Sequence, residues 1–264
     1  MPTTLPKVSV LMTIYNHQDF LKKSISSITK QSFKNWELIA CENGSEDNSS
    51  NYLKKIKDKR IRKFFFKKNI GRTKCLNFAL KKAKGEYIAI LDSDDIAHPK
   101  RLDKQVKHLK KKKEIALIGS WYTLIDENDK VVKKTNYKIK DNSLSRNLLF
   151  FNLIGHSTIM FRKNLITRIG LYPENIKYMQ DYAFFLRVYK KYKIEILPKN
   201  LTNCRIHHDQ SETKRVSKSL LIEKELLQLL VWVKNNFNLS GIENLFYLFN
   251  YIKLKIKILK KKLI

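Results

Sequence analysis

The chain has 264 residues, of which 43% are hydrophobic, and a formal net charge of +30 at pH 7. This length allows one large domain or two small ones with a real core, and seven glycines and five prolines are too few for long flexible linkers. A charge this high attracts polyanions such as nucleic acid, anionic lipid or nucleotide-linked substrates, although a biased composition accounts for part of it equally well.

Three cysteines, Cys41, Cys75 and Cys204, are widely spaced along the chain. Their small, odd number argues against a disulfide framework or a zinc site and fits a reducing compartment. The first residues show no basic region followed by an apolar stretch, so we expect no signal peptide. No apolar run approaches the ~20 residues that a membrane-spanning helix needs. We therefore expect a cytoplasmic protein.

The first hundred residues alternate between strand and helix patterns. Strands are expected over Val8 to Ile14, Trp36 to Cys41, Ile61 to Phe66 and Tyr87 to Leu91, and helices over Phe20 to Ile28, Asn48 to Ile56 and Arg72 to Ala83. Such alternation implies parallel strands joined by right-handed crossovers. Ligands of such sheets bind beyond the carboxyl ends of the strands.

The remaining residues give less regular patterns. Helices are expected over Arg101 to Lys113 and Tyr182 to Tyr192, and strands over Ile115 to Ile125, Lys130 to Lys134, Ser157 to Phe161 and Ile194 to Pro198. From Ser217 onward the chain is helical and basic.

An acidic cluster, Asp92-Ser93-Asp94-Asp95, directly follows the fourth expected strand. Three of these four residues are acids, although the chain has 24 acidic residues against 54 basic ones. Close carboxylates raise each other's pKa unless a cation neutralises them, which favours a divalent metal that shares its remaining ligand positions with a phosphate. The alternative is an Asp-rich turn in which Asp95 caps the following helix. Tyr15-Asn16 and Glu42-Asn43-Gly44-Ser45 also follow strands, so these segments should meet at one rim of the sheet.

Six segments resemble family 2 glycosyltransferases, which have the GT-A fold. In the order of the family they are Val8 to Asn16, Glu42 to Asp47, Asn69-Ile70-Gly71 with Cys75-Leu76-Asn77, Leu91 to Asp95 with Pro99, Arg101 and Leu102, Met179 to Tyr182, and Arg205-Ile206-His207. Each segment is weak alone, but the order and spacing of all six are specific. The resemblance runs from about Val8 to Ser211.

The resemblance implies an α/β fold, with a Rossmann-like mixed sheet of the GT-A type flanked by helices. Residues 1–100 would form the nucleotide-sugar-binding half, and residues 101–211 the acceptor-binding and catalytic half of the same domain. Residues 212–264 would form a basic helical C-terminal extension.

The resemblance also implies roles at the catalytic centre. Asp181 would be the general base, with a helix cap as the alternative role. Asp94 would hold Mn²⁺ or Mg²⁺, and His207 would complete the metal shell or contact the diphosphate, unless it is a surface histidine of a loop. Asp92 lies on the same side of an extended segment as Asp94 and would contact the donor ribose or the metal. Ser93, next to Asp92, would also bind the nucleotide sugar.

The nucleobase and phosphates of the donor would meet a second group of residues. Glu42 or Asn43 would accept a hydrogen bond from the imide N–H of uracil or thymine, although an Asn-Gly turn explains this segment too. Thr13 and Tyr15 would line the base pocket, and strand-end packing explains them nearly as well. Arg72 would meet the donor phosphates, unless it belongs to a solvated helix face.

We therefore expect an inverting, metal-dependent glycosyltransferase that uses a UDP- or dTDP-linked sugar. The acceptor would be a saccharide or a lipid-linked precursor of cell-surface polysaccharide or lipooligosaccharide. His156 would border the acceptor pocket, with a core or loop histidine as the alternative. One competing function is a nucleic-acid or polyanion binder, which the charge favours but no recognised motif supports. The other is an inactive sugar-nucleotide binder, suggested by Gln180 and Asn43 at positions where the family carries acids.

The C-terminal segment alternates lysines with apolar residues. On a helix, Ile252, Ile256 and Leu259 share one face, with lysines on another. This pattern is typical of a helix on an anionic membrane surface, and we expect the protein at the inner face of the cell membrane. The alternative is a solvated terminal helix packed on the domain.

Overall fold

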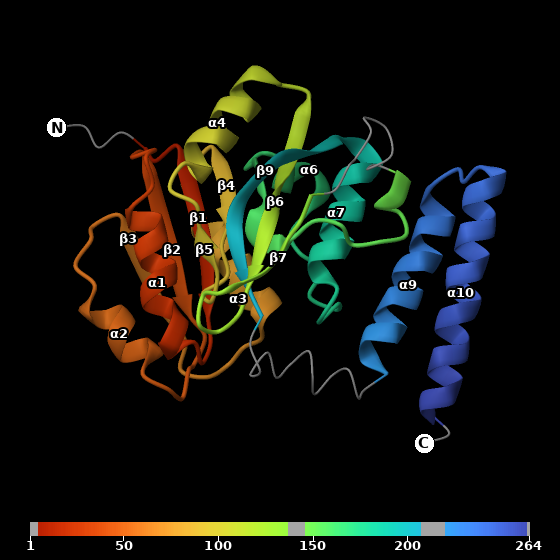
Figure 1. Ribbon diagram of the computed structural model, residues 1–264, viewed down its shortest axis with the longest axis horizontal. Coiled ribbons are helices and arrows are strands. Elements are labelled where there is room, and N and C mark those ends of the chain that lie inside the picture. The colour runs from red at the N-terminus through yellow and green to blue at the C-terminus, as the bar shows by residue number, and fades with distance from the viewer. Residues whose placement is uncertain (1–4, 137–145, 207–219, 263–264) are drawn as a thin grey trace.

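A mixed β-sheet runs through the molecule, and helices cover both of its faces (Figure 1). The computed structural model describes residues 5–136, 146–206 and 220–262. The described strands are β1 (Val8–Ile14), β2 (Trp36–Glu42), β3 (Ile61–Phe65), β4 (Tyr87–Ile90), β5 (Ile96–Ala97), β6 (Ile115–Ile125), β7 (Val131–Lys134), β8 (Met160–Arg162) and β9 (Lys193–Arg205). They lie in the order β3-β2-β1-β4-β8-β6-β9-β5, with β7 paired to β6.

The first four strands of this order, β3, β2, β1 and β4, pair in parallel. This confirms the pattern predicted for the first hundred residues. Beyond them, β8 lies antiparallel to both β4 and β6, whereas β9 runs parallel to β6. The predicted Rossmann-like mixed sheet of the GT-A type is therefore confirmed.

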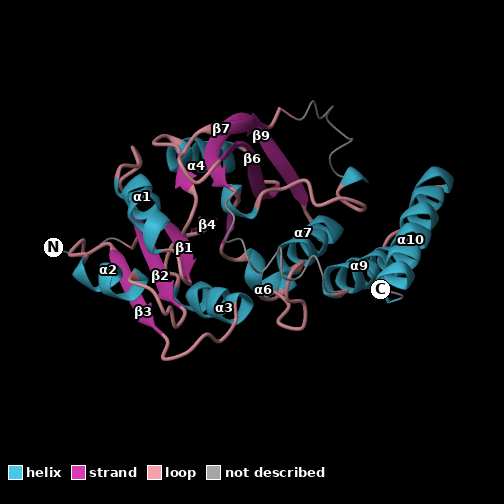
Figure 2. Ribbon diagram, turned by 60° about the horizontal axis from the view of Figure 1, so that its bottom comes forward, coloured by secondary structure: helices cyan, strands magenta, loops and turns pink. Residues whose placement is uncertain are grey.

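The helices form a layer on each face of the sheet, as Figure 2 shows for α1 and α4 on one face and for α3 and α6 on the other. Side chains of β1 alternate between the two layers: Val8, Val10 and Met12 pack in the cluster that contains α1 and α4, whereas Leu11 packs in the cluster that contains α3 and α7. The described helices are α1 (Gln18–Thr29), α2 (Ser49–Lys55), α3 (Arg72–Lys82), α4 (Arg101–Lys111), α6 (Leu165–Ile169), α7 (Gln180–Lys191), α9 (Leu221–Asn236) and α10 (Gly241–Lys262).

The prediction of a strand over Ser157 to Phe161 is wrong for the first half of this segment. His156–Thr158 forms a 3-10 turn, and the strand is β8, Met160–Arg162. The Thr158 main-chain N–H and hydroxyl both donate to the Gly155 carbonyl, at 2.9 and 2.7 Å. Such local side-chain bonds compete with extended pairing, so the β-branched residues here do not form a strand.

The strand expected over Ile194 to Pro198 is too short, because β9 continues to Arg205. Proline ends most interior strands because it lacks an N–H donor. Here the register with β6 shifts after Ser120, so that Leu197 pairs with Ser120 and Asn200 with Trp121. Pro198 falls in this irregularity, where no ladder hydrogen bond is needed.

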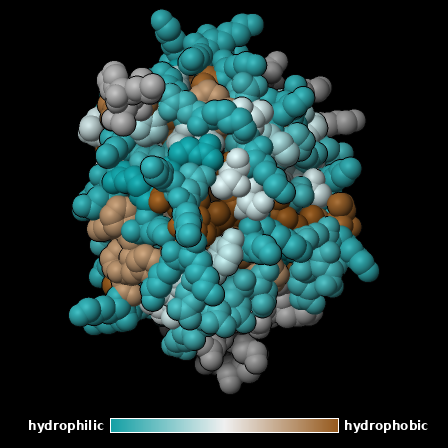
Figure 3. Space-filling view, turned by 90° about the vertical axis from the view of Figure 1, so that its left-hand side faces the viewer, coloured by the Kyte–Doolittle hydropathy of each residue, from teal (hydrophilic) through white to brown (hydrophobic). Residues whose placement is uncertain are grey.

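The C-terminal helices α9 and α10 lie side by side at one edge of the molecule (Figures 1 and 2). Leu229 and Val233 of α9 belong to the same core cluster as α7. Helix α10 packs on α9, with Glu243 and Ile258 each 8% exposed. No helix of the described residues is long and apolar enough to cross a membrane. At the other side of the molecule, hydrophilic side chains cover most of the surface (Figure 3), as the net charge predicts.

Candidate active site

A polar cavity of about 650 Å³ opens at the carboxyl ends of β1, β2 and β4. Eight of the residues predicted for the site line it: Thr13, Tyr15, Asn43, Arg72, Asp92, Ser93, Asp94 and Asp181. The predicted convergence of strand-end segments on one rim is thus observed. Of the other two predicted residues, Glu42 lies outside the lining and His207 lies outside the described residues.

Asp92 and Arg72 form the central ion pair of this cavity. Arg72 is the first residue of α3, and its Nη2 lies 2.5 Å from Asp92 Oδ1. The Nδ1 atom of His156 lies 3.0 Å from the same guanidinium nitrogen and 3.8 Å from the carboxylate. Burial alone would raise the pKa of Asp92, but the positive charge of Arg72 and the His156 ring hold it well below its usual range. Asp92 is therefore an anion at any physiological pH.

Two buried arginines donate hydrogen bonds to main-chain carbonyls in and near the turn that carries the acids. Arg101 Nη2 donates to the carbonyls of Ile90 and Ile159, at 2.8 and 3.1 Å. Arg205 Nε donates to the Asp94 carbonyl at 2.9 Å. Both side chains are excluded from water, so these bonds fix the backbone from which Asp92 and Asp94 extend.

Asp95 is not among the residues that line the cavity, and the alternative in which it caps the following helix is wrong. The helix that follows begins at Arg101, and its N-cap is Lys100 without a side-chain cap bond. Instead Asp95 Oδ1 accepts the main-chain N–H of Arg205 at 2.8 Å. Burial and the neighbouring charges of Asp94 and Asp92 raise the pKa of Asp95 well above its usual range.

Ser93 ties the ends of β1 and β4 together. Its hydroxyl donates to the Thr13 carbonyl at 3.0 Å and lies 2.6 Å from His17 Nδ1. Because the Ser93 hydroxyl donates its single proton to the Thr13 carbonyl, it accepts the second bond, and Nδ1 of His17 is the donor. Ser93 lines the cavity, but its hydroxyl is already satisfied by these two partners.

The polar side chains of the turn after β2 already form hydrogen bonds within the protein. Glu42 is 3% exposed, and its Oε1 accepts the Ser45 N–H at 2.6 Å. The Asn43 amide donates to Asn69 Oδ1 at 3.0 Å and accepts the Ile70 N–H at 3.0 Å. Gly44 has φ +74°, and a Cβ there would lie 2.4 Å from the Lys68 carbonyl carbon, so only glycine fits this crossing.

Asp181 lies in the first turn of α7 and lines the same cavity. The helix begins one residue earlier than Asp181, not at Tyr182 as predicted. Asp181 Oδ1 accepts the Tyr182 N–H at 2.7 Å, and Oδ2 accepts from Asn152 Nδ2 at 3.2 Å. Asp181 thus lies near the positive end of the dipole of α7.

The sequence pattern did not single out several residues that line the cavity, among them His17, Lys177 and Tyr178. His17 directly follows the strand-end pair Tyr15-Asn16, and this position is the only signal that could have indicated it. His156, which was expected to border the acceptor pocket, lines this cavity, and its ring contacts Arg72 and Tyr172, the latter through Nε2 at 3.2 Å. These contacts join residues far apart in the sequence.

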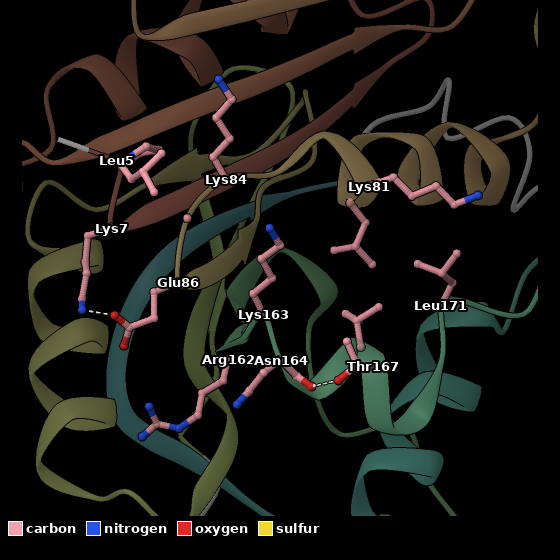
Figure 4. Close-up of a pocket in the computed structure, with 14 residues that line it drawn as sticks. Leu5, Lys7, Lys81, Lys84, Glu86, Arg162, Lys163, Asn164, Thr167 and Leu171 are labelled. Carbon is pink, nitrogen blue, oxygen red and sulfur yellow. Dashed lines mark hydrogen bonds and ion pairs between the residues drawn. The ribbon is translucent and has the colours of Figure 1, made fainter. Parts of the chain in front are cut away.

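A second cavity, of about 890 Å³, opens beside the N-terminal ends of β1 and β4, at the opposite end of these strands from the first cavity (Figure 4). Its lining combines basic side chains, including Lys84, Arg162 and Lys163, with apolar ones. Its one acidic lining residue, Glu86, is paired with Lys7. The carboxylates that acid-base or metal chemistry needs are therefore gathered at the first cavity.

The first cavity can hold a divalent cation with few protein ligands. Among the described residues, no group of three or more His, Cys, Asp or Glu side chains is placed to bind a metal. Asp94, 8% exposed, and Asp92 supply carboxylate oxygens, the ligand type that Mg²⁺ and Mn²⁺ prefer. Such a set fits a cation that takes its other ligands from water and from phosphates of a substrate.

Fold and site together define a GT-A-type α/β protein with an acid-bearing cavity at its strand ends. The structure of S. aureus TarS 1-349 matches with a TM-score of 0.72 and 19% identity, over 95% of this chain and 72% of that one. The chain belongs to glycosyl transferase family 2, whose family model matches residues 9–169.

Two relatives cover most of the chain. An uncharacterized glycosyltransferase of Methanocaldococcus jannaschii is 34% identical over 224 residues, which are 82% of this chain and 76% of the relative. One of Haemophilus influenzae is 32% identical over 230 residues, 80% of this chain and 71% of the relative. The family inferred from six short segments is thereby confirmed.

Proposed function

We propose that the protein is an inverting glycosyltransferase that moves a sugar from a nucleotide-diphosphate donor to a hydroxyl of an acceptor. The observation that carries this proposal is that Asp181 lines the same cavity of about 650 Å³ as Asp92 and Asp94. One cavity then offers both a base and carboxylates for a cation. Sugar transfer from a diphosphate needs both, because a proton leaves the acceptor while negative charge grows on the leaving group.

Asp94, together with Asp92, would hold the divalent cation, Mn²⁺ or Mg²⁺. A bound cation of this kind neutralises the charge that develops on a departing diphosphate. Arg72 keeps Asp92 ionised at 2.5 Å and adds a positive charge beside it. His207, which was expected at the metal, lies outside the described residues and stays a prediction.

Asp181 would take the proton of the acceptor hydroxyl. The acceptor oxygen then bonds to the anomeric carbon while the bond from that carbon to the diphosphate oxygen breaks. Attack from the face opposite the leaving group inverts the anomeric configuration. Asn152 and the Tyr182 N–H each hold one carboxylate oxygen, so the group is oriented before the acceptor arrives.

The donor side is assigned to residues 1–100 and the acceptor side to residues 101–211. Thr13, Tyr15 and Asn43 line the cavity and would surround a uracil or thymine base. Glu42, the other residue predicted to read the base, lies outside the lining and stays a prediction. S. aureus TarS has structures in complex with UDP and with UDP-GlcNAc. The mannosyltransferase PcManGT from Pyrobaculum calidifontis, with a TM-score of 0.65 and 15% identity, has one with GDP-Man and Mn²⁺. A UDP- or dTDP-linked sugar is the donor proposed here.

The acceptor is proposed to be a saccharide or a lipid-linked precursor of a surface polysaccharide or lipooligosaccharide, met at the inner face of the cell membrane. Helix α10 supports this, because its face away from α9 is apolar and exposed by 48% to 71%: Ile242, Leu245, Phe249, Ile252, Ile256 and Leu259. Lys253 and Lys255 flank this outer face in the sequence pattern, which suits an anionic lipid surface. Each basic residue near such a surface adds ~1 kcal/mol.

A thermal-shift screen of nucleotide sugars with Mn²⁺ or Mg²⁺ tests the donor proposal. A ligand that binds only the folded state raises the unfolding temperature. At a hundredfold excess over its Kd, such a ligand adds about 2.7 kcal/mol to the free energy of unfolding. We expect selective, metal-dependent stabilisation by a uridine or thymidine diphosphate sugar. Stabilisation by guanosine diphosphate sugars alone would contradict the base assignment, and no stabilisation by any of them would contradict donor binding.

A further inference from the structure

The C-terminal helical hairpin reaches back to the segment that carries the proposed base. Glu225 of α9 is 9% exposed, and its Oε1 accepts the main-chain N–H of Lys177 at 2.7 Å. Its Oε2 accepts the N–H groups of Tyr178 and Met179, at 2.9 and 3.0 Å. One buried carboxylate therefore binds three successive main-chain donors, and bonds to an ionised acceptor are the stronger kind.

These three residues lead directly into α7. Met179 is the N-cap of α7 and makes no side-chain cap bond. The first N–H groups of a helix lack partners within the helix, and a negative charge near them is favourable. Glu225 supplies that charge from another helix, immediately before the residue pair Gln180-Asp181.

Carbonyl groups of the same segment accept hydrogen bonds from the side chain of Gln180. In the orientation that pairs its donors with acceptors, the Gln180 amide donates to the carbonyls of Lys177 and Tyr178, at 2.8 and 3.1 Å. Its oxygen then accepts from Arg72 Nη1 at 2.7 Å. A continuous chain of bonds thus runs from Glu225 through this segment and Gln180 to Arg72 and its partner Asp92.

We propose that Glu225 is a positioning residue for sugar transfer, and that α9 completes the active site. This inference rests on the proposed function of Asp181 as the base. Glu225 touches neither donor nor acceptor in this scheme. It fixes the backbone of residues 177–179, so that Asp181 meets the acceptor hydroxyl at a set place. Misplacement of a catalytic group by about 1 Å can cost about 10²-fold in rate.

The test compares Glu225→Ala and Glu225→Gln with Glu223→Gln as the matched control. Glu223 lies on the same helix and is 4% exposed, but its charge pairs with Lys257 at 2.8 Å, on the α10 side. We expect kcat for transfer to fall by about 10²-fold in Glu225→Ala and by less in Glu225→Gln, with donor Kd unchanged within about twofold. Glu223→Gln should keep kcat even where its unfolding temperature falls.

Hydrogen exchange gives a readout that needs no sugar transfer. The amides of Lys177, Tyr178 and Met179 should exchange about tenfold faster or more in Glu225→Ala, and at the wild-type rate in Glu223→Gln. Unchanged exchange would overturn the proposed contact. Faster exchange with an unchanged kcat would overturn the positioning role. If Glu225→Ala fails to fold, Glu225→Gln decides by the same two measurements.

Failure of the proposed function gives a different result. Wild-type protein that binds no nucleotide sugar would overturn sugar transfer and with it the positioning role, while the exchange rates still decide whether Glu225 holds residues 177–179. A loss of kcat in the Glu223→Gln control equal to that in Glu225→Ala would show a general effect of α9 stability and would overturn a specific role of Glu225.

Discussion

Arg72 and Asp92 lie twenty positions apart in the chain, yet their side chains meet at 2.5 Å at the base of the active-site cavity. The ion pair joins the start of α3 to the turn after β4. Arg72 also contacts His156 and, through Nη1, Gln180. The guanidinium therefore links Asp92 to the segment that carries Asp181.

Replacing Arg72 by Gln should weaken donor binding. The variant loses the charge that keeps the pKa of Asp92 low and the bonds to His156 and Gln180. Bonds to charged groups contribute about 1.5–3 kcal/mol each, so we expect donor Kd to rise by about tenfold to a hundredfold. Calorimetric titration measures it, with Arg168→Gln on α6 as the control. A Kd within twofold of wild type would contradict the role of Arg72.

Asp181→Asn should remove transfer and leave donor binding intact. The amide keeps the shape of the side chain but cannot accept the acceptor proton, and general bases contribute about 10²–10⁴-fold in rate. Initial rates with the donor that the thermal-shift screen selects measure this loss. Asp103→Asn, on the helix α4, is the control. Transfer at the original rate in Asp181→Asn would show that the base is another group.

Asp94→Asn should lose the part of donor-induced stabilisation that depends on Mn²⁺ or Mg²⁺. A neutral amide oxygen is a poorer ligand than a carboxylate for a hard cation. The measurement is the unfolding temperature with nucleotide sugar, with and without metal, in Asp94→Asn and in Asp103→Asn. An unchanged metal-dependent shift in Asp94→Asn would exclude Asp94 as an essential ligand.

Glu37 should make stability depend on pH below neutrality. Burial would raise its pKa, but bonds from Ser9, Arg62 and the Lys84 N–H, at 2.6, 2.8 and 2.7 Å, lower it below the ordinary value of 4.5. Because the folded-state pKa is the lower one, the unfolded chain binds the proton first as pH falls. This contribution to stability is full above about pH 5 and is lost progressively below the ordinary value of 4.5.

The Glu37→Gln variant checks this sign. Its unfolding free energy should be lower at pH 7 by about 1–3 kcal/mol and should fall less steeply between pH 5 and pH 3 than that of wild type. Glu86→Gln is the control, because the Glu86 side chain is 50% exposed and exposed pairs contribute little. A wild-type slope in Glu37→Gln would contradict the assignment.

The outer face of α10 should hold the protein to anionic vesicles. Ile252→Ser combined with Ile256→Ser removes two side chains that are each 48% exposed. Burial of one such side chain in an apolar phase is worth about 1.5–3 kcal/mol, so partition into phosphatidylglycerol vesicles should weaken by about tenfold or more. Val131→Ser with Val132→Ser, each 59% exposed on β7, is the control. Equal partition of both double variants would contradict the membrane proposal.

A second copy of this chain is the alternative partner for the outer face of α10, which would then pair in a dimer. Its apolar residues are spaced three and four apart, as in a coiled-coil seam. Lysines flank the seam, and they would repel each other between two copies. A concentration-dependent dimer that disappears in the Ile252→Ser and Ile256→Ser double variant would contradict the membrane assignment.

The sequence by itself determined the parallel half of the sheet and the acids at its rim. Apolar runs and turn residues are local signals, and the carboxyl ends of parallel strands must share one rim of the sheet. The position of Asp92, Asp94 and Asn43 at that rim therefore follows from the sequence alone. The irregular half was harder to predict, because β9 passes Pro198 only through a register shift with its neighbour β6.

Only the tertiary structure decided which groups surround those acids. The ring of His156 and the carboxylate of Glu225 reach the site from segments whose local patterns indicate ordinary turns and helices. The positions of Glu225 and Tyr178 differ by 47, and their contact depends on how α9 packs against α7. Periodicity along a chain predicts which face of an element is buried, but the partner across that face is set by the packing of the whole fold.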